Sequence, residues 1–250
     1  MLLSDILEQL SIGELSQLAI GGYSSGIGIE ECNYGKIIPH INLALSELYS
    51  RFPINMEQLR IEQQEGVNEY YLDPKFAQSN ETSVEPIKYI QDLPPAKPFV
   101  TSPLRIEAIF NHEGKETRYT EDDGSYVQEL SATDQDNYWM AFTPSFNSIY
   151  LPYPEPGVPV YVTYRSAPEK IKVIGVVPHK TEIPLPMTLL APLLSFVASR
   201  VFSNLNSDNS LNEGQYYYKK FEAACAKLVK EDVFNTYNKL NDKLDTNGWV

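Results

Sequence analysis

The chain has few of the residues that build disulfide frameworks and metal centres. Its 250 residues include two cysteines, Cys32 and Cys225, and three histidines, His40, His112 and His179. Two cysteines are too few for a disulfide scaffold, and neither has the spacing of a zinc site. The histidines lie in different segments without a partner motif, which favours structural or exposed roles. The sequence therefore predicts no metal and no cofactor, and Cys225, on the apolar face of an expected helix, should be a buried free thiol.

Long hydrophobic runs are also missing. The most apolar stretch, residues 183–202, is interrupted by three prolines, two serines and Arg200. Its unbroken apolar pieces are far shorter than the roughly 18 residues that a membrane span needs. The first five residues are acidic and amphipathic and lack the basic start of a signal peptide. We therefore expect a buried helix in residues 183–202, no membrane partner, and synthesis in the cytosol.

Basic residues are scarce relative to acidic ones. The chain has 20 Lys and Arg against 33 Asp and Glu, a formal net charge of −13. A surface of this charge repels DNA phosphates, so the sequence disfavours tight DNA binding by the whole chain. A hydrophobic content of 42% with 17 tyrosines indicates a folded, aromatic-rich protein.

The order of the sequence patterns is the strongest indication of fold. Apolar residues recur at helical spacing near both ends, and about a hundred residues between them alternate with the period of strands. We predict an α+β protein in which residues 1–54 and 184–231 form one helical bundle. Residues 55–183 should form an inserted antiparallel β-sandwich or barrel-like domain, and residues 232–250 a C-terminal docking tail.

The expected helices supply the expected bundle core. Residues 36–52, 187–203 and 210–231 carry their large apolar side chains on one face or, in the second case, nearly all around. Ser-x-x-Glu patterns beginning at Ser11 and Ser210 predict a capping box at the start of two helices. The predicted core side chains are Ile41, Leu45, Leu48, Leu194, Val197, Val201, Phe221 and Leu228.

The middle of the chain reads as short strands separated by turns. Clear alternation occurs in residues 104–110 and 158–165, with weaker strands near residues 57–62, 67–71, 117–120, 126–130, 138–143 and 148–151. Residues 78–103 are polar and contain five prolines, which predicts a long irregular loop.

The last segment is polar with widely spaced large apolar residues. This composition is typical of a segment that docks onto a partner. The candidate contact residues are Phe234, Tyr237, Leu240, Leu244 and Trp249.

Two other function classes have some support. An aromatic β domain, including Trp139, would suit a binding module for a carbohydrate or a virion fibre. A carboxylate-pair hydrolase would need two acids a few ångströms apart, and Glu107, Glu121, Asp134 and Asp136 are the candidates. No spacing selects a pair among them, and the acidic loops lack the glycine and distant glutamate of a calcium loop. We therefore do not expect an enzyme.

Several pieces of the sequence resemble one protein family. They are the helix "INLALSELYSRFPI", the strand pair "SIYLPYPEPGVPVYVTYRSAP", and "IPLPMTLLAPLLSFVASRVFSNL" followed by "NEGQYYYKKFEAACAKL". With the overall layout, these resemble the head-to-tail adaptor proteins of short-tailed phages, of the tail tubular protein A type, including ring proteins of crAss-like phages.

The resemblance implies a structural role in the virion. Such adaptors join a helical bundle to a β domain and assemble as dodecameric rings between the portal and the tail. It implies that the C-terminal segment contacts the portal protein and that the β domain faces the tail nozzle, a second ring or fibre proteins. The genome would pass through the ring without specific binding, for which an acidic channel is suited.

We predict that residues 232–250 fold only on a partner, because the segment has too little apolar surface to order itself. Hydrogen exchange of the isolated chain should show no protection of these amides. Protection comparable to that of the bundle helices would contradict this prediction.

Overall fold

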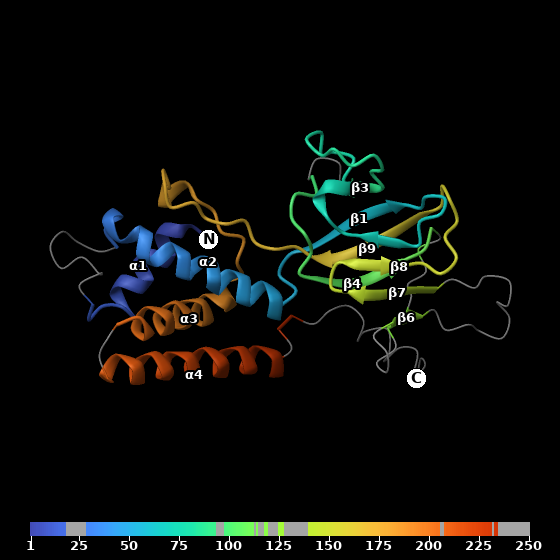
Figure 1. The fold of residues 1–250 in the computed structure, drawn as a ribbon. Coiled ribbons are helices and arrows are strands. Elements are labelled where there is room, and N and C mark those ends of the chain that lie inside the picture. Colours follow the sequence, from blue (N-terminus) through green and yellow to red (C-terminus); the bar gives the residue numbers. More distant parts are fainter. Residues whose placement is uncertain are drawn as a thin grey trace, which may run out of the picture. The chain divides into compact units, whose positions relative to one another are not determined.

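The chain forms an α+β fold with two compact units. The computed structural model describes residues 1–18, 29–93, 98–112, 114, 118–119, 125–127, 140–205, 208–231 and 233–234. One unit combines Met1–Ile54 with Pro168–Val250 and is helical, and the other, Asn55–Ala167, is built from strands. Helices from the first and the last part of the sequence therefore belong to one unit, and the strands are inserted between them in the sequence (Figure 1).

The helical unit is organised around α3 (Leu190–Ser203). This helix contacts α1 (Leu3–Ile12), α2 (Tyr34–Arg51) and α4 (Asp208–Lys230), and lies between α2 and α4 (Figure 1). Most of its residues are buried, as expected for a helix that is apolar on nearly every side. Short 3-10 turns at Glu31–Asn33 and Met187–Leu189 precede α2 and α3, and another lies at Pro178–Lys180.

The predicted core residues are buried with one exception. Ile41, Leu45, Leu48, Leu194, Val197, Val201 and Phe221 are at most 7% exposed. Leu228 is half-buried instead, because it lies in the last turns of α4, beyond the region where α3 covers that helix.

The connection from the strands back to α3 belongs to the helical unit. The amino group of Met1 donates to the carbonyl of Ile183 at 3.0 Å, and the amide of Leu3 donates to Thr181 at 2.9 Å. The Tyr49 hydroxyl donates to Pro184 at 2.6 Å. The boundary predicted at residue 184 was therefore wrong by some sixteen residues, since the unit resumes at Pro168. Backbone pairing with the N-terminus, which carries no side-chain pattern, holds this connection in place.

The β unit contains two antiparallel sheets that share one core. The first has the order β3-β1-β9-β4 and the second β2-β8-β7-β6-β5. Buried side chains from both, such as Ile61, Tyr70, Ile149 and Val162, form a single cluster, consistent with the predicted sandwich. The strands are β1 (Met56–Glu62), β2 (Glu69–Tyr71), β3 (Ile90–Leu93), β4 (Arg105–Phe110), β5 (Arg118–Tyr119), β6 (Ser125–Val127), β7 (Met140–Ser145), β8 (Ser148–Tyr150) and β9 (Pro159–Arg165).

Two predictions of local structure were wrong. The proline-rich stretch is not one irregular loop, since it contains β3, which pairs with β1 in register Ile61↔Ile90. The two Ser-x-x-Glu patterns do not open helices. Ser11 lies inside α1, where its hydroxyl donates to the Glu8 carbonyl, and Ser210 lies in the first turn of α4, donating to Leu205.

Helices α3 and α4 approach each other closely at Gly214. A Cβ atom at this position would lie 2.5 Å from the Ser203 hydroxyl, 3.1 Å from the Ser203 amide nitrogen and 3.2 Å from the Ser199 carbonyl. The hydroxyl could rotate away, but the two backbone atoms belong to α3 and can retreat only if the helices separate. Glycine is therefore required here by close helix packing, since α4 is an ordinary helix at this point.

We predict that Gly214→Ala lowers the free energy of unfolding by about 1–3 kcal/mol, the usual cost of overpacking a tight contact. The matched control is Gly35→Ala in α2, where an added Cβ meets nothing within 4 Å. That change should be neutral or slightly stabilising, because alanine is the better helix former. Equal effects of the two substitutions in urea unfolding would refute the packing argument.

Candidate docking surface

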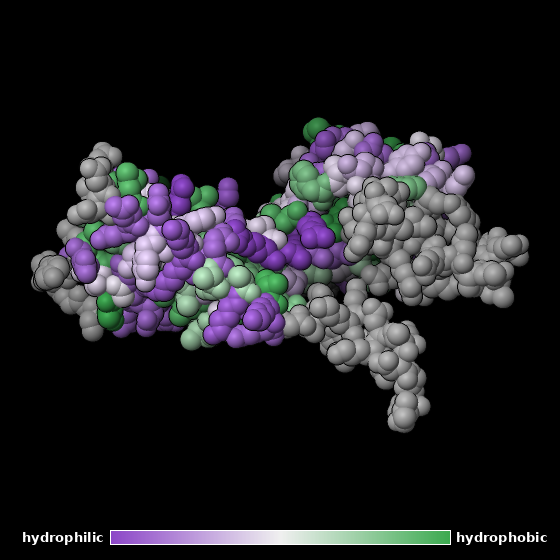
Figure 2. Space-filling view, turned by 90° about the horizontal axis from the view of Figure 1, so that it is seen from below, coloured by the Kyte–Doolittle hydropathy of each residue, from purple (hydrophilic) through white to green (hydrophobic). Residues whose placement is uncertain are grey.

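The outer side of α4 is a long helical surface that the bundle leaves uncovered. Only four residues of the described part of α4 are fully buried, namely Ser210, Gly214, Phe221 and Cys225, and they form a narrow stripe against α3 and α2. The remaining surface carries lysines together with large apolar and aromatic side chains. The exposed members of the second group are Leu211, Tyr216, Tyr218 and Val229. Figure 2 views the molecule from the α4 side and shows green and pale green surface among the purple of this unit.

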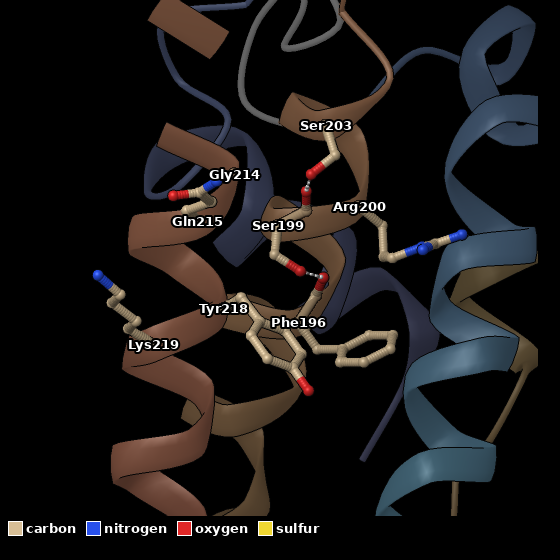
Figure 3. Close-up of a pocket in the computed structure, with 8 residues that line it drawn as sticks. All are labelled: Phe196, Ser199, Arg200, Ser203, Gly214, Gln215, Tyr218 and Lys219. Atoms are coloured by element: carbon tan, nitrogen blue, oxygen red, sulfur yellow. Dashed lines mark hydrogen bonds between the residues drawn. The ribbon is translucent and has the colours of Figure 1, made fainter. Parts of the chain in front are cut away.

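A groove between α3 and α4 has a volume of about 330 Å³. Figure 3 shows the residues that line it. Two of them, Ser199 and Ser203, donate their hydroxyls to carbonyls of their own helix, at 2.7 Å each. The cations Arg200 and Lys219 point in opposite directions, Arg200 toward α2 (Figure 3). The groove therefore offers the aromatic side chains of Phe196 and Tyr218 to a partner, while its two cations do not converge on a small ligand.

An ion-pair network joins α2 to α4 at one end of the unit. The guanidinium of Arg51 donates two hydrogen bonds to the Glu222 carboxylate, both 2.8 Å, and a third of 2.7 Å to Glu47. It also lies 4.9 Å from the ring centre of Phe221. Hydrogen bonding to Arg51 lowers the pKa of Glu222, and the Tyr218 hydroxyl adds a further hydrogen bond. The bidentate geometry fixes the register of the two helices.

A shallow hollow of about 500 Å³ lies beside this network. Its apolar lining includes Phe52, Ala226 and Val229. Phe234, just beyond the end of α4, packs its ring on Phe52 with centroids 5.0 Å apart. The first of the predicted tail contacts is thus half-buried on its own bundle. Tyr237, Leu240, Leu244 and Trp249 lie outside the described residues.

Cys225 is the buried free thiol that the sequence predicts. Burial raises its pKa to about 11, so the thiol is neutral at physiological pH and a poor nucleophile. Cys32 is exposed.

The residues weighed for catalysis are not brought together where the structure describes them. Glu107 forms an ion pair with Arg165 within the first sheet, and Glu121, Asp134 and Asp136 lie outside the described residues. His40 is half-buried in α2, and both burial and nearby Arg200 lower its pKa. Among the described residues there is no group of three or more His, Cys, Asp or Glu side chains that could hold a metal ion. Nor does any described helix have the length and hydropathy to cross a bilayer.

Comparison of the chain with protein-family models and with curated proteins finds no match.

We predict a coupling energy of about 0.5–1 kcal/mol between Arg51 and Glu222, because both side chains are partly exposed to solvent. A double-mutant cycle of Arg51→Met and Glu222→Gln in urea unfolding measures it. The pKa of Glu222 is lowered by folding, so its contribution should be complete above the ordinary value of 4.5 and lost as the pH falls through the lowered pKa.

The control is the Lys227–Glu231 pair, which is far more exposed, so Glu231→Gln should have no measurable effect. A coupling energy that is the same at pH 7 and pH 2.5 would show that the contact is not electrostatic.

Proposed function

We propose that this protein is a structural head-to-tail adaptor, a virion component that forms a ring between a portal and a tail.

 The single observation that carries the proposal is the outer side of α4, a long helical surface that mixes exposed aromatic and aliphatic side chains with lysines and runs directly into the C-terminal segment. The resemblance to phage adaptors supports the same role.

The composition of this surface is that of a protein contact. Tyr216 is 63% exposed and Val229 is 68% exposed, and Tyr218 lines the groove between α3 and α4. Exposed apolar side chains cost solvation free energy unless a partner covers them, and aromatic residues are enriched in protein interfaces. In a ring adaptor these residues would contact the portal or a neighbouring subunit.

The start of the tail supports a docking role for the residues that follow. The contact of Phe234 with Phe52 fixes the residue that precedes the rest of the segment, next to the apolar hollow. A tail that leaves from a fixed point loses less entropy when it binds, because its first residue is already ordered. We propose that Tyr237, Leu240, Leu244 and Trp249 contact the portal protein.

A virion-associated binding module is the second candidate. It is favoured by exposed aromatic side chains on the β unit, among them Tyr71, Phe146 and Tyr150. In that case the β unit would bind a carbohydrate or a fibre, and the helical unit would only anchor it.

The deciding measurement is the light-scattering mass of the full chain, alone and mixed with portal rings. For an adaptor we expect a mass gain of about twelve subunits per portal, the number that the family resemblance implies. In the full chain, Leu240→Asp with Leu244→Asp should abolish the gain. A chain ending at Phe234 should lose it too while keeping the contact with Phe52.

The matched control is Val84→Asp, which changes a fully exposed loop residue of the β unit. It should leave the mass gain unchanged. A chain that stays at 28.3 kDa with every portal tested would refute the adaptor role and favour the binding module.

A further inference from the structure

Residues 170–180 form a loop of the helical unit. The tip of this loop is apolar, and lysines lie on both sides of the tip. Ile174 at the tip is 95% exposed, and its neighbours Val173 and Val177 are exposed as well. Lys170, Lys172 and Lys180 flank the tip, and no acidic residue lies between them. The whole chain has a net charge of −13, whereas residues 170–180 carry a net positive charge.

The loop is fixed at both ends. At the start of the loop, the Asn42 side chain forms two hydrogen bonds with the backbone of Ile171. It donates to the Ile171 carbonyl at 3.0 Å and accepts from the Ile171 amide at 2.9 Å. On the other side the residues after the loop pair with the N-terminus, through Leu3 and Thr181. Between these anchors, Gly175 takes a φ of +73°, a conformation that other residues adopt only with strain.

A fixed loop with an exposed apolar tip is suited to binding. A hollow of about 440 Å³ is lined by residues of the loop together with Glu169, Thr181 and Glu182 at its two ends. Ile174 is 95% exposed, so the tip is not packed into the bundle. Exposure of Ile174 costs solvation free energy that only a partner can recover. Because the loop is already ordered, little conformational entropy remains to be lost when the partner binds.

The net charges of the two units indicate which partner the loop binds. The β unit has 8 Lys and Arg against 18 Asp and Glu, a net charge of −10, whereas the helical unit has 12 against 15. A loop with three lysines is therefore attracted most strongly to the β unit of another copy of this chain.

One part of the β unit combines acidic and apolar surface. Strand β2 is at the edge of the second sheet as far as that sheet is described, and it carries exposed Glu69 and Tyr71. Tyr150 of β8 is exposed and lies in register with Glu69. Two tyrosine rings beside a carboxylate would accept an aliphatic tip and a neighbouring lysine.

We propose that the 170–180 loop seats on the β2–β8 surface of a second copy. The two contact surfaces differ, so each copy offers one of each, and repetition of the contact closes a ring if the rotation allows. This inference rests on the proposed ring adaptor, for which it supplies the contact between subunits.

The test is photo-crosslinking from the loop in the full chain. A benzophenone amino acid replaces Ile174, the chain is irradiated alone at rising concentration and with portal rings, and the crosslinked peptides are identified by mass spectrometry. We expect crosslinks between copies to peptides within residues 55–167. Ile174→Asp should weaken self-association by about tenfold or more, as expected for loss of a central apolar contact. Ile12→Asp in the last turn of α1, the same change at another exposed isoleucine of the helical unit, should not affect this contact.

The outcomes separate this inference from the proposed function. Rings that form with no crosslink from position 174, or with crosslinks only to the helical unit, would overturn the loop contact and leave the adaptor. Crosslinked copies that never join a portal would support the contact and count against the adaptor. Crosslinking only to the portal would overturn the loop contact, as would a chain that stays monomeric under all conditions.

Discussion

The structure of the helical unit depends on the burial of α3. This helix is apolar on nearly every side, so it is stable only when α1, α2 and α4 surround it. Two of these helices come from the start of the chain and one from its end. The strands must therefore form an insertion, because the chain has to return to the N-terminal helices before α3 can be covered. The hydrogen bonds between Met1 and Ile183, and between Tyr49 and Pro184, tie that return in place.

The packing of α4 follows from the same constraint. Gly214 lets α4 approach α3 closely, and the Arg51–Glu222 pair attaches it to α2, so a narrow stripe is enough to hold the helix. The rest of α4 remains free to contact a partner. A helix held by a narrow stripe gains less hydrophobic free energy than a buried one, and the ion pair and the stacked rings of Phe202 and Tyr217 add to its attachment. The proposed adaptor role uses this uncovered surface.

Sequence patterns located some helices and strands of this fold and missed others. The strong alternation in residues 158–165 located β9, and helical spacing located α2 and α3, because burial of one face leaves a clear period in the sequence. Strand β3 was missed because its neighbourhood is rich in proline and its buried positions include Asp92, which accepts a hydrogen bond from the amide of Phe99. The capping boxes predicted at Ser11 and Ser210 were wrong because a serine hydroxyl can donate to a carbonyl of the preceding turn as well as cap a helix.

The sequence by itself determined the α+β class, the helical ends with an inserted β unit, and most of the bundle core, since these depend on apolar periodicity. Only the tertiary structure decided that residues 168–183 belong with the helices, that Phe234 packs on Phe52, and that the 170–180 loop presents Ile174 to solvent. These features arise from contacts between segments far apart in the chain, by backbone pairing and single side chains, which leave no periodic pattern in the residues that make them.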